Sequence, residues 1–285
     1  MKTLIRTLLL FLLLGVCSCE KPVFDEKDNQ GKTNLTISVT NWRQVAYTES
    51  TRSLVDITGY SSRLNFVLYK DGERIKSLTQ AQGDTGYGTV SLSLMPGNYK
   101  VLVLAHSSKG NPTLTNPEAV KFDNSISYSD TFYYYGDITV TTESKTHELT
   151  LTRATSLLRF IIADELPSNF YHVKLLYTGG SGVFNAVTGY GGNVDSRQEK
   201  LYAVDGYKAP LTLPIYTFLQ ADEGKLNVTV TAMDKDRKVI LERTFTDIPM
   251  KRNMITEYTG AFFEHENGFS LKGETDWAGT IQETY

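Results

Sequence analysis

Hydrophobic residues along most of the chain recur at every second position, which is the spacing of half-buried β-strands. Leu35, Ile37 and Val39 would share one face of a first strand over residues 33–40, with polar residues between them. Comparable patterns predict strands at 64–69, 74–79, 89–94, 99–105, 138–140, 147–151, 157–162, 171–177, 211–219, 226–232, 239–245 and 254–263. The sequence therefore predicts an all-β protein.

Turn residues and a repeated strand–turn–strand pattern indicate how these strands are grouped. Asp71-Gly72 tolerates positive φ angles and predicts a hairpin between the second and third strands. A strand, a turn containing Pro and Asn, and another strand occur twice, at 94–105 and at 248–263. We interpret this repetition as two consecutive β-sandwich domains, 33–153 and 154–285, with the boundary near Arg153 to Thr155.

Other stretches carry weaker signals. The apolar run at 157–162 suits a strand buried on both faces. Pro214 within 211–219 indicates an edge strand or a bulge. Residues 106–130 are polar and irregular, with room for a short helix.

The N-terminus has the pattern of an export signal. Lys2 and Arg6 precede an apolar run at 8–14, which is too short to span a bilayer. In a bacterial lipoprotein signal an aliphatic residue stands at −3 and a small residue at −1, before the Cys that receives the lipid. Cys19 has Val16 at −3 and Ser18 at −1, whereas Cys17, the alternative, has Val16 at −1. Residues 1–18 are therefore predicted to be a lipoprotein signal peptide.

Residues 19–32 form a polar, acidic stretch that we interpret as a flexible leash. Acidic residues directly after a lipidated Cys resemble the surface-export signal of Bacteroidetes lipoproteins; a plain tether is the other interpretation. The leash would tether a folded body to a bilayer through the N-terminal acyl chains.

Composition excludes several classes of protein. There are 29 Lys and Arg against 32 Asp and Glu, a net charge of −3, so no excess of positive charge favours a nucleic-acid partner. Both cysteines lie within the signal region, which excludes a disulfide framework or a Cys-based zinc site in the body.

A search for catalytic or metal-binding patterns finds little. The four histidines, His106, His147, His172 and His265, contain no i, i+4 pair. Ser181 lies among glycines but lacks the flanking Gly of a nucleophile elbow, and Asp234-Lys235-Asp236 lacks the later residues of a calcium loop, which favours turns for both. We expect no catalytic residues, no metal and no cofactor.

Two further patterns concern sugars. Tyr133, Tyr134 and Tyr135 could form an aromatic platform for a glycan, although such residues are more often ordinary strand residues. Asn34-Leu35-Thr36 and Asn227-Val228-Thr229 match the N-glycosylation pattern, which we interpret as accidental strand alternation behind a bacterial signal.

Two segments carry a resemblance to a known family. With the lipoprotein signal and the acidic leash, LTLTRATSLLRF at 149–160 and IPMKRNMITEYTG at 248–260 resemble the fimbrillin-like, FimB/Mfa-type fimbrial anchor family of Bacteroidales. That family is related to the subunits of type V fimbriae. The resemblance implies two transthyretin-like β-sandwich domains and a lipid-anchored outer-membrane protein that attaches fimbriae, or pili, to the cell.

The resemblance also implies a mode of assembly. Stalk subunits of such fimbriae are trimmed by an arginine-specific protease, and a donor strand from the next subunit fills the exposed groove, whereas anchors keep their lipid. Arg43 and Arg52 lie where trimming could fall. The closing segment, 268–285, would either complete the last sheet, which its glycines favour, or act as a donor strand.

The leading hypothesis is a non-enzymatic anchor or minor structural subunit of a type V fimbria that assembles with fimbrial subunits by β-strand addition. The alternative is a surface lipoprotein that uses exposed aromatic residues to bind a host or bacterial glycan or protein in cell adhesion. A hydrolase is disfavoured, because no acid/base or nucleophile constellation stands out.

Cys19→Ala is expected to abolish incorporation of radiolabelled palmitate, because the lipidated Cys is lost. Cys17→Ala, two residues away, is the matched control and should retain the label. Label that survives Cys19→Ala and disappears in Cys17→Ala would place the lipid on Cys17.

Overall fold

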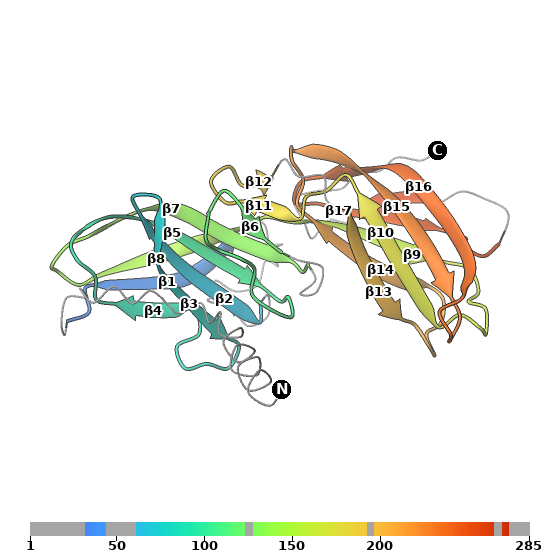
Figure 1. The fold of residues 1–285 in the computed structure, drawn as a ribbon, viewed down its shortest axis with the longest axis horizontal. Helices are drawn as coiled ribbons and strands as arrows, with labels where there is room; N and C mark the ends of the chain where they lie inside the picture. Colours follow the sequence, from blue (N-terminus) through green and yellow to red (C-terminus); the bar gives the residue numbers. More distant parts are fainter. Residues whose placement is uncertain (1–31, 44–60, 123–127, 193–196, 265–269, 274–285) are drawn as a thin grey trace, which may run out of the picture.

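The computed structural model describes residues 32–43, 61–122, 128–192, 197–264 and 270–273. Every regular element within those ranges is a β-strand, which confirms the all-β prediction. Figure 1 shows the strands gathered in two bodies that lie end to end along the long axis. No helix in the same ranges has the length and hydrophobicity needed to cross a bilayer.

Seven strands form the first body, which we call the N-terminal half, in one sheet of order β3-β2-β5-β7-β8-β1-β4. The Asp71-Gly72 turn, with φ angles of 52° and 86°, joins β2 to β3 and confirms the predicted hairpin. The strand bounds are β1 Leu35–Arg43, β2 Arg63–Lys70, β3 Glu73–Ala81, β4 Thr89–Leu92, β5 Gly97–His106, β7 Thr131–Val140 and β8 Lys145–Arg153.

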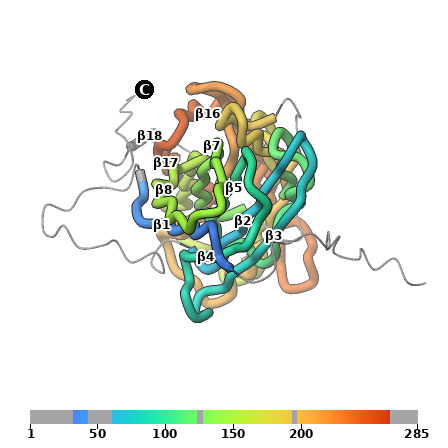
Figure 2. The backbone as a smooth tube through the Cα atoms, turned by 90° about the vertical axis from the view of Figure 1, so that its left-hand side faces the viewer, coloured from blue at the N-terminus to red at the C-terminus, as the bar shows by residue number. Residues whose placement is uncertain are grey.

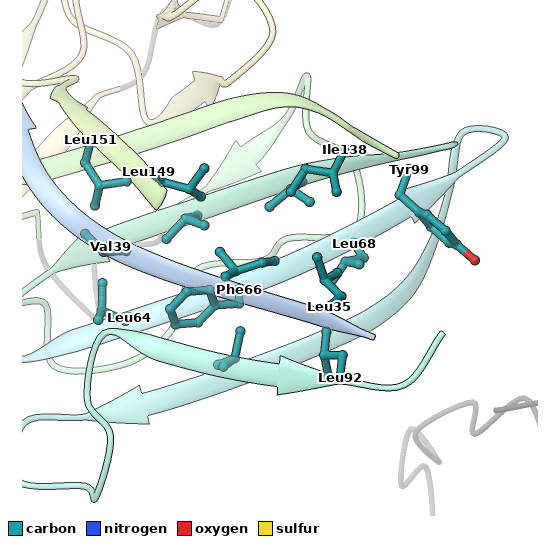
Figure 3. Packing of buried hydrophobic residues seen from close by; sticks show 14 of the residues in the cluster. Leu35, Val39, Leu64, Phe66, Leu68, Leu92, Tyr99, Ile138, Leu149 and Leu151 are labelled. Atoms are coloured by element: carbon teal, nitrogen blue, oxygen red, sulfur yellow. The ribbon is translucent and has the colours of Figure 1, made fainter. Parts of the chain in front are cut away.

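This sheet folds over on itself where β7 meets β8. Only Phe132–Arg153 and Tyr133–Thr152 are paired between those two strands. As a result β8, β1 and β4 face β2, β5 and β7, and apolar side chains fill the space between the two layers (Figure 3). Leu35, Ile37 and Val39 are buried in this core, as the alternation predicts.

The first strand is longer than predicted because it contains a bulge. Its register with β8 shifts between Val39 and Asn41, so alternation fails there. Trp42 then turns into the core, and its ring centroid lies 4.7 Å from that of Phe132. The strand therefore ends at Arg43 rather than at residue 40.

Asn34 fastens the beginning of β1 to two other segments. Its Nδ2 donates hydrogen bonds of 2.8 Å to the carbonyls of Leu94 and Thr141, and its Oδ1 accepts one of 2.9 Å from the Leu94 N–H. The side chain is 3% exposed. Beyond this point β1 lies between β4, to which it is antiparallel, and β8, to which it is parallel.

The second body, which we call the C-terminal half, contains two four-stranded sheets with the orders β13-β10-β15-β16 and β14-β9-β17-β18. One hydrophobic core lies between them. Within the second sheet β17 runs parallel to β9. The strand bounds are β9 Ser156–Ile162, β10 His172–Thr178, β13 Gln198–Ala203, β14 Leu211–Thr217, β15 Glu223–Met233, β16 Val239–Lys251, β17 Ile255–Gly260 and β18 Ser270–Gly273.

Two expectations about individual strands differ from the structure. Strand β7 begins at Thr131 rather than at residue 138, and the described part of 106–130 contains a short strand and no helix. In β9 only one face is fully buried, because Arg159 and Ile161 are half-buried on the other. Arg159 forms a 3.0 Å ion pair there with Glu257 of β17.

Asn34→Ala is expected to lower the free energy of unfolding by about 2–4 kcal/mol, because it removes three hydrogen bonds and leaves buried backbone groups unsatisfied. Thr36→Ala, on the outward face of the same strand, should change it by less than about 0.5 kcal/mol. Urea denaturation of the mature chain carrying Cys19→Ala measures both. Equal effects of the two substitutions would contradict the role given to Asn34.

Candidate functional site: the junction between the halves

A small third sheet joins the two halves. Strand β6 (Val120–Lys121), from the connection between β5 and β7, pairs with β11 (Val183–Asn185). Strand β11 in turn pairs with β12 (Tyr190–Gly191). A segment of the N-terminal half is thus hydrogen-bonded through its backbone to a hairpin of the C-terminal half.

An aromatic cluster lies beneath this small sheet. Val67 and Tyr69 of β2, with Leu102 and Leu104 of β5, point away from the core of the N-terminal half and are buried at the junction. The cluster also contains Leu114, Val120, Phe122, Tyr128, Ala154, Phe184, Ala186 and Phe218. The Phe184 and Phe218 rings are stacked, with centroids 5.1 Å apart. Strands β2 and β5 are therefore buried on both faces: one face lies in the core of the N-terminal half and the other in this aromatic cluster.

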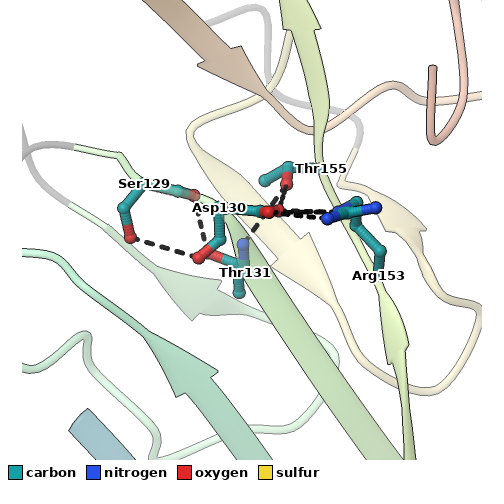
Figure 4. A network of polar contacts seen from close by, with 5 residues as sticks. All are labelled: Ser129, Asp130, Thr131, Arg153 and Thr155. Carbon is teal, nitrogen blue, oxygen red and sulfur yellow. Dashed lines mark hydrogen bonds and ion pairs between the residues drawn. The ribbon is translucent and has the colours of Figure 1, made fainter. Parts of the chain in front are cut away.

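A polar network fixes the short connection between the halves (Figure 4). Arg153, at the end of β8, donates from Nε and from a terminal nitrogen to the Asp130 carboxylate at 2.9–3.1 Å. The Thr155 hydroxyl donates to the same carboxylate at 3.1 Å. Arg153 is 4% exposed, and its guanidinium lies 4.6 Å from the Phe132 ring centroid. The segment between β8 and β9 thus has little freedom to bend.

Nearer the surface, four side chains from both halves form what we call the Tyr133 cluster: Tyr133, Tyr190, Asp222 and Arg252. The Arg252 guanidinium lies 4.3 Å from the Tyr190 ring centroid. The Tyr190 hydroxyl donates a 3.0 Å hydrogen bond to Asp222. Burial raises the pKa of Tyr133, and the nearby charge of Arg252 opposes that rise.

Gly189 is required for this cluster to form. Its φ angle is +79°, and a Cβ atom at that position would lie 2.1 Å from the Tyr133 hydroxyl. Any other residue would displace Tyr133 or the turn that carries Tyr190.

Aromatic faces beside an Arg and an Asp are also groups that recognise sugars, so this cluster is the candidate binding surface of the molecule.

The three predicted tyrosines do not share one face. Alternation along β7 directs Tyr133 and Tyr135 toward the junction and Tyr134 toward the core of the N-terminal half. All three are half-buried. The Tyr135 ring centroid lies 5.9 Å from Lys100 Nζ, and Lys100 pairs with Asp137 at 2.6 Å. Glycan contact at these residues stays a prediction, with Tyr133 and Tyr135 on the same side.

Other predicted positions fall near the chain ends. Arg43 is the last residue of β1 and is paired with Thr152. Cys17, Cys19 and Arg52 lie outside the described residues. Within the closing segment, residues 270–273 form β18 and pair with β17 at the edge of the last sheet. Lipidation and proteolytic trimming therefore stay predictions.

The residues considered for chemistry are scattered. His106, His147 and His172 lie on β5, β8 and β10, and His265 is outside the described part of the chain. Within that part, no group of three or more His, Cys, Asp or Glu side chains is arranged to hold a metal ion. Asp234 accepts two backbone hydrogen bonds in the β15–β16 turn, which confirms the predicted hairpin.

Lys200 of β13 is a half-buried cation that the sequence patterns did not predict. Its Nζ lies 5.6 Å and 6.0 Å from the ring centroids of Tyr202 and Tyr216, and 3.5 Å from the Pro214 carbonyl oxygen. Burial lowers the pKa of Lys200 to about 8, and Lys109 contributes to that shift. The available signal was a Lys and a Tyr two residues apart, which a strand places on one face.

Comparison with known proteins places the chain in a family. The model of the "Family of unknown function (DUF6562)" matches residues 25–285. The chain belongs to this family. Comparison with curated proteins finds no match.

Two solved structures share the fold of this DUF6562 protein at low identity, and a third is similar at a lower TM-score. One, from Bacteroides thetaiotaomicron, is named among "putative polysaccharide binding proteins"; it has a TM-score of 0.52 and 11% identity, covering 89% of this chain and 99% of the other. A "putative adhesin" from the same organism has a TM-score of 0.50 and 10% identity, with the same coverage. A "fimbrial assembly protein" from Parabacteroides distasonis has a TM-score of 0.45 and 12% identity, covering 88% and 98%.

The pH dependence of stability provides a test of the environment of His106, which is fully buried beside Phe122 at the junction. Its Nε2 donates a hydrogen bond of 2.9 Å to Asn65 Oδ1, and its Nδ1 accepts one of 3.2 Å from the Ser108 N–H. With one ring nitrogen donating and the other accepting, the imidazole is neutral. Burial lowers the pKa of His106 from 6.5 to about 4, and Arg63 adds to the shift. Between those values the unfolded chain binds a proton that the folded chain does not, so stability falls as the pH falls.

We therefore expect this residue to contribute a loss of about 2–3 kcal/mol in unfolding free energy between pH 7 and pH 4. Urea denaturation across this range should show a shallower dependence for His106→Gln than for the parent chain. From pH 7 to pH 8 the two should run parallel, because His106 is neutral in both states there. Identical slopes below pH 6 would contradict a buried, neutral His106.

Proposed function

We propose that this protein is an outer-membrane lipoprotein that acts as an anchor or minor structural subunit of a type V fimbria and assembles by β-strand addition. In this proposal residues 1–18 are the signal peptide, 19–32 the leash, and 33–153 and 154–285 two transthyretin-like sandwich domains. It functions by holding partners, without catalysis.

The observation that carries the proposal is the position of β1. The described strand nearest to Cys19 is the middle strand of its layer, hydrogen-bonded to β4 on one side and β8 on the other. Residues 44–60 lie between β1 and the other described strands of that half. Strand β1, from near one end of the chain, completes the layer between β4 and β8. This resembles strand addition, except that the added strand belongs to the same molecule.

The attachments of β1 support an anchor over a trimmed stalk subunit. Asn34 fastens one end of the strand, and Trp42 is buried near the other. A cut after Arg43 or Arg52 would separate Cys19 from the folded body, leaving only noncovalent contacts through β1. If the chain is not cut there, the lipid on Cys19 stays covalently joined to the folded body.

Strand β16 is the longest edge strand in the described part of the chain. It is thirteen residues long and lies at the edge of its sheet. No described strand pairs with its outer side. An extended segment of a fimbrial subunit could bind there through backbone hydrogen bonds, with alternate side chains providing selectivity.

The alternative function is glycan binding at the surface, and the Tyr133 cluster favours it. Tyr133, Tyr190 and Arg252 bring two aromatic rings and a cation together at the junction. A solved structure with the same fold is named as polysaccharide-binding. In this alternative the partner is a host or bacterial glycan, or a protein ligand.

Replacing Cys19 by Ala is expected to release fimbriae into the medium, because the body would still assemble but would no longer be tethered. Deleting the gene should release fimbriae or change their length. Cys17→Ala cells, as the matched control, should keep attached fimbriae. Electron microscopy of cells and immunoblots of the medium measure all three strains.

The alternative predicts a different set of results. Attached fimbriae of normal length in the deletion strain, together with lost binding to a glycan, would rule out the anchor and favour glycan binding. In that case Arg252→Ala should lose the same glycan binding while the protein stays on the membrane.

A further inference from the structure

In each half of the molecule, the strand by which the chain enters lies beside and parallel to a strand near the end of that half. That strand is β8 in the N-terminal half and β17, which β18 follows, in the C-terminal half. In the N-terminal half β1 pairs with β8, from Leu35–Lys145 to Arg43–Thr152. In the C-terminal half β9 pairs with β17, from Leu157–Ile255 to Ile162–Gly260. Every other strand pair among the described residues is antiparallel.

The directions of these pairs follow the long axis of the molecule. Strand β8 ends at the junction and leads through two residues into β9. The parallel register therefore places the start of β1 at the end of the N-terminal half that is far from the junction. By the same reasoning β17 ends at the far end of the C-terminal half. Figure 1 shows the halves end to end along this axis, and Figure 2, which looks along it, shows one half behind the other.

A pull between the two ends of the body therefore acts on both pairs in the same way. It draws β1 back from its first residue and β8 forward from its last, so the strands are pulled past each other. Under this shear, the evenly spaced backbone hydrogen bonds of a parallel ladder share the force. A pull that separated two strands from one end would instead break those bonds one after another.

We infer that the protein is a tension-bearing link in which two shear-loaded strand pairs, β1–β8 and β9–β17, act in series between its ends. The inference relies on the proposed function only for the direction of the force, with lipid at one end and a filament, joined through β16, that pulls from the far end, where β16 begins. A closed sandwich does not require its first strand to run parallel to a strand near its end, and antiparallel pairs are two to three times commoner than parallel ones.

Side chains hold each end of these pairs in place. Asn34 fastens the start of β1, and the Asp130–Arg153 ion pair braces the passage from β8 to β9. The Asp164 carboxylate, two residues after β9, accepts the backbone N–H groups of residues 262–264 just after β17. The Arg159–Glu257 ion pair links β9 to β17 directly.

Strand β18 stands outside this path. It is antiparallel to β17, and its last residue, Gly273, lies opposite Thr256 near the start of β17. A pull on the chain beyond Gly273 would peel this short strand away before the β9–β17 pair is loaded. The handle in a pulling experiment is therefore best placed before β18.

Single-molecule force spectroscopy on the full mature chain with Cys19→Ala tests the inference by comparing two pairs of handles. Lys32→Cys with Glu264→Cys pulls along the body and shears both pairs. Lys32→Cys with Glu143→Cys is the matched control, because Glu143 lies in the β7–β8 turn and this pull peels β1 from the start of β8. All three positions are exposed.

At equal force, the end-to-end pull should give an unfolding rate at least about tenfold lower than the peeling pull, equivalent to a barrier about 1.4 kcal/mol higher. Equal rates, or faster unfolding in the end-to-end pull, would overturn the inference. Urea denaturation of both variants checks that each is folded. The result concerns the folded body alone, so a failure here is distinguishable from a failure of the fimbrial proposal, which is judged by release of fimbriae from cells.

Discussion

Burial of the outer faces of β2 and β5 at the junction is the contact on which the rest of the structure depends. These strands are apolar on both faces, and each face has to be covered. One face is covered by β1, β4 and β8, and the other by the cluster around Phe184 and Phe218. A fully buried ring or branched side chain contributes about 1.5–3 kcal/mol, so the junction is as much a hydrophobic core as the interior of either half. The polar network at Asp130 and the small third sheet then set the angle at which this contact is made.

The periodicity of the sequence predicts most of the fold because it depends on short-range geometry. The alternation around Leu35 and the Asp71-Gly72 turn each involve only neighbouring residues, and both predictions are confirmed. Strand β7 was underestimated because Tyr133 to Tyr135 faces two different apolar environments, which hides its alternation. The apolar run in β9 suggested two buried faces, but the neighbouring Glu257 lets Arg159 occupy the outer one.

The junction itself could not be predicted, since its contacts join residues far apart in the sequence. Arg252 reaches Tyr133 and Tyr190 only after three separate segments have folded together. Gly189 looks like an ordinary turn glycine until the position of the Tyr133 hydroxyl is known. The site therefore depends on how the two halves meet, and the shear-loaded pairs depend on the same fixed arrangement. A flexible junction would separate Tyr133 from Tyr190 and Arg252 and would change the direction of force on both halves.

Two edges of the C-terminal half carry features that oppose pairing with a second chain. Strand β14 carries Pro214, which has no N–H to offer a neighbour, and it is an edge strand, as the Pro predicted. Strand β13, at the edge of the facing sheet, carries the half-buried Lys200, and a charge directed inward on an edge strand disfavours pairing with a second chain. These two edges lie on the same flank, since the Tyr202 hydroxyl of β13 donates to the Pro214 carbonyl of β14. Proteins tethered side by side at high density on one bilayer would otherwise stack through such edges into sheets, and this flank protects them from that form of aggregation.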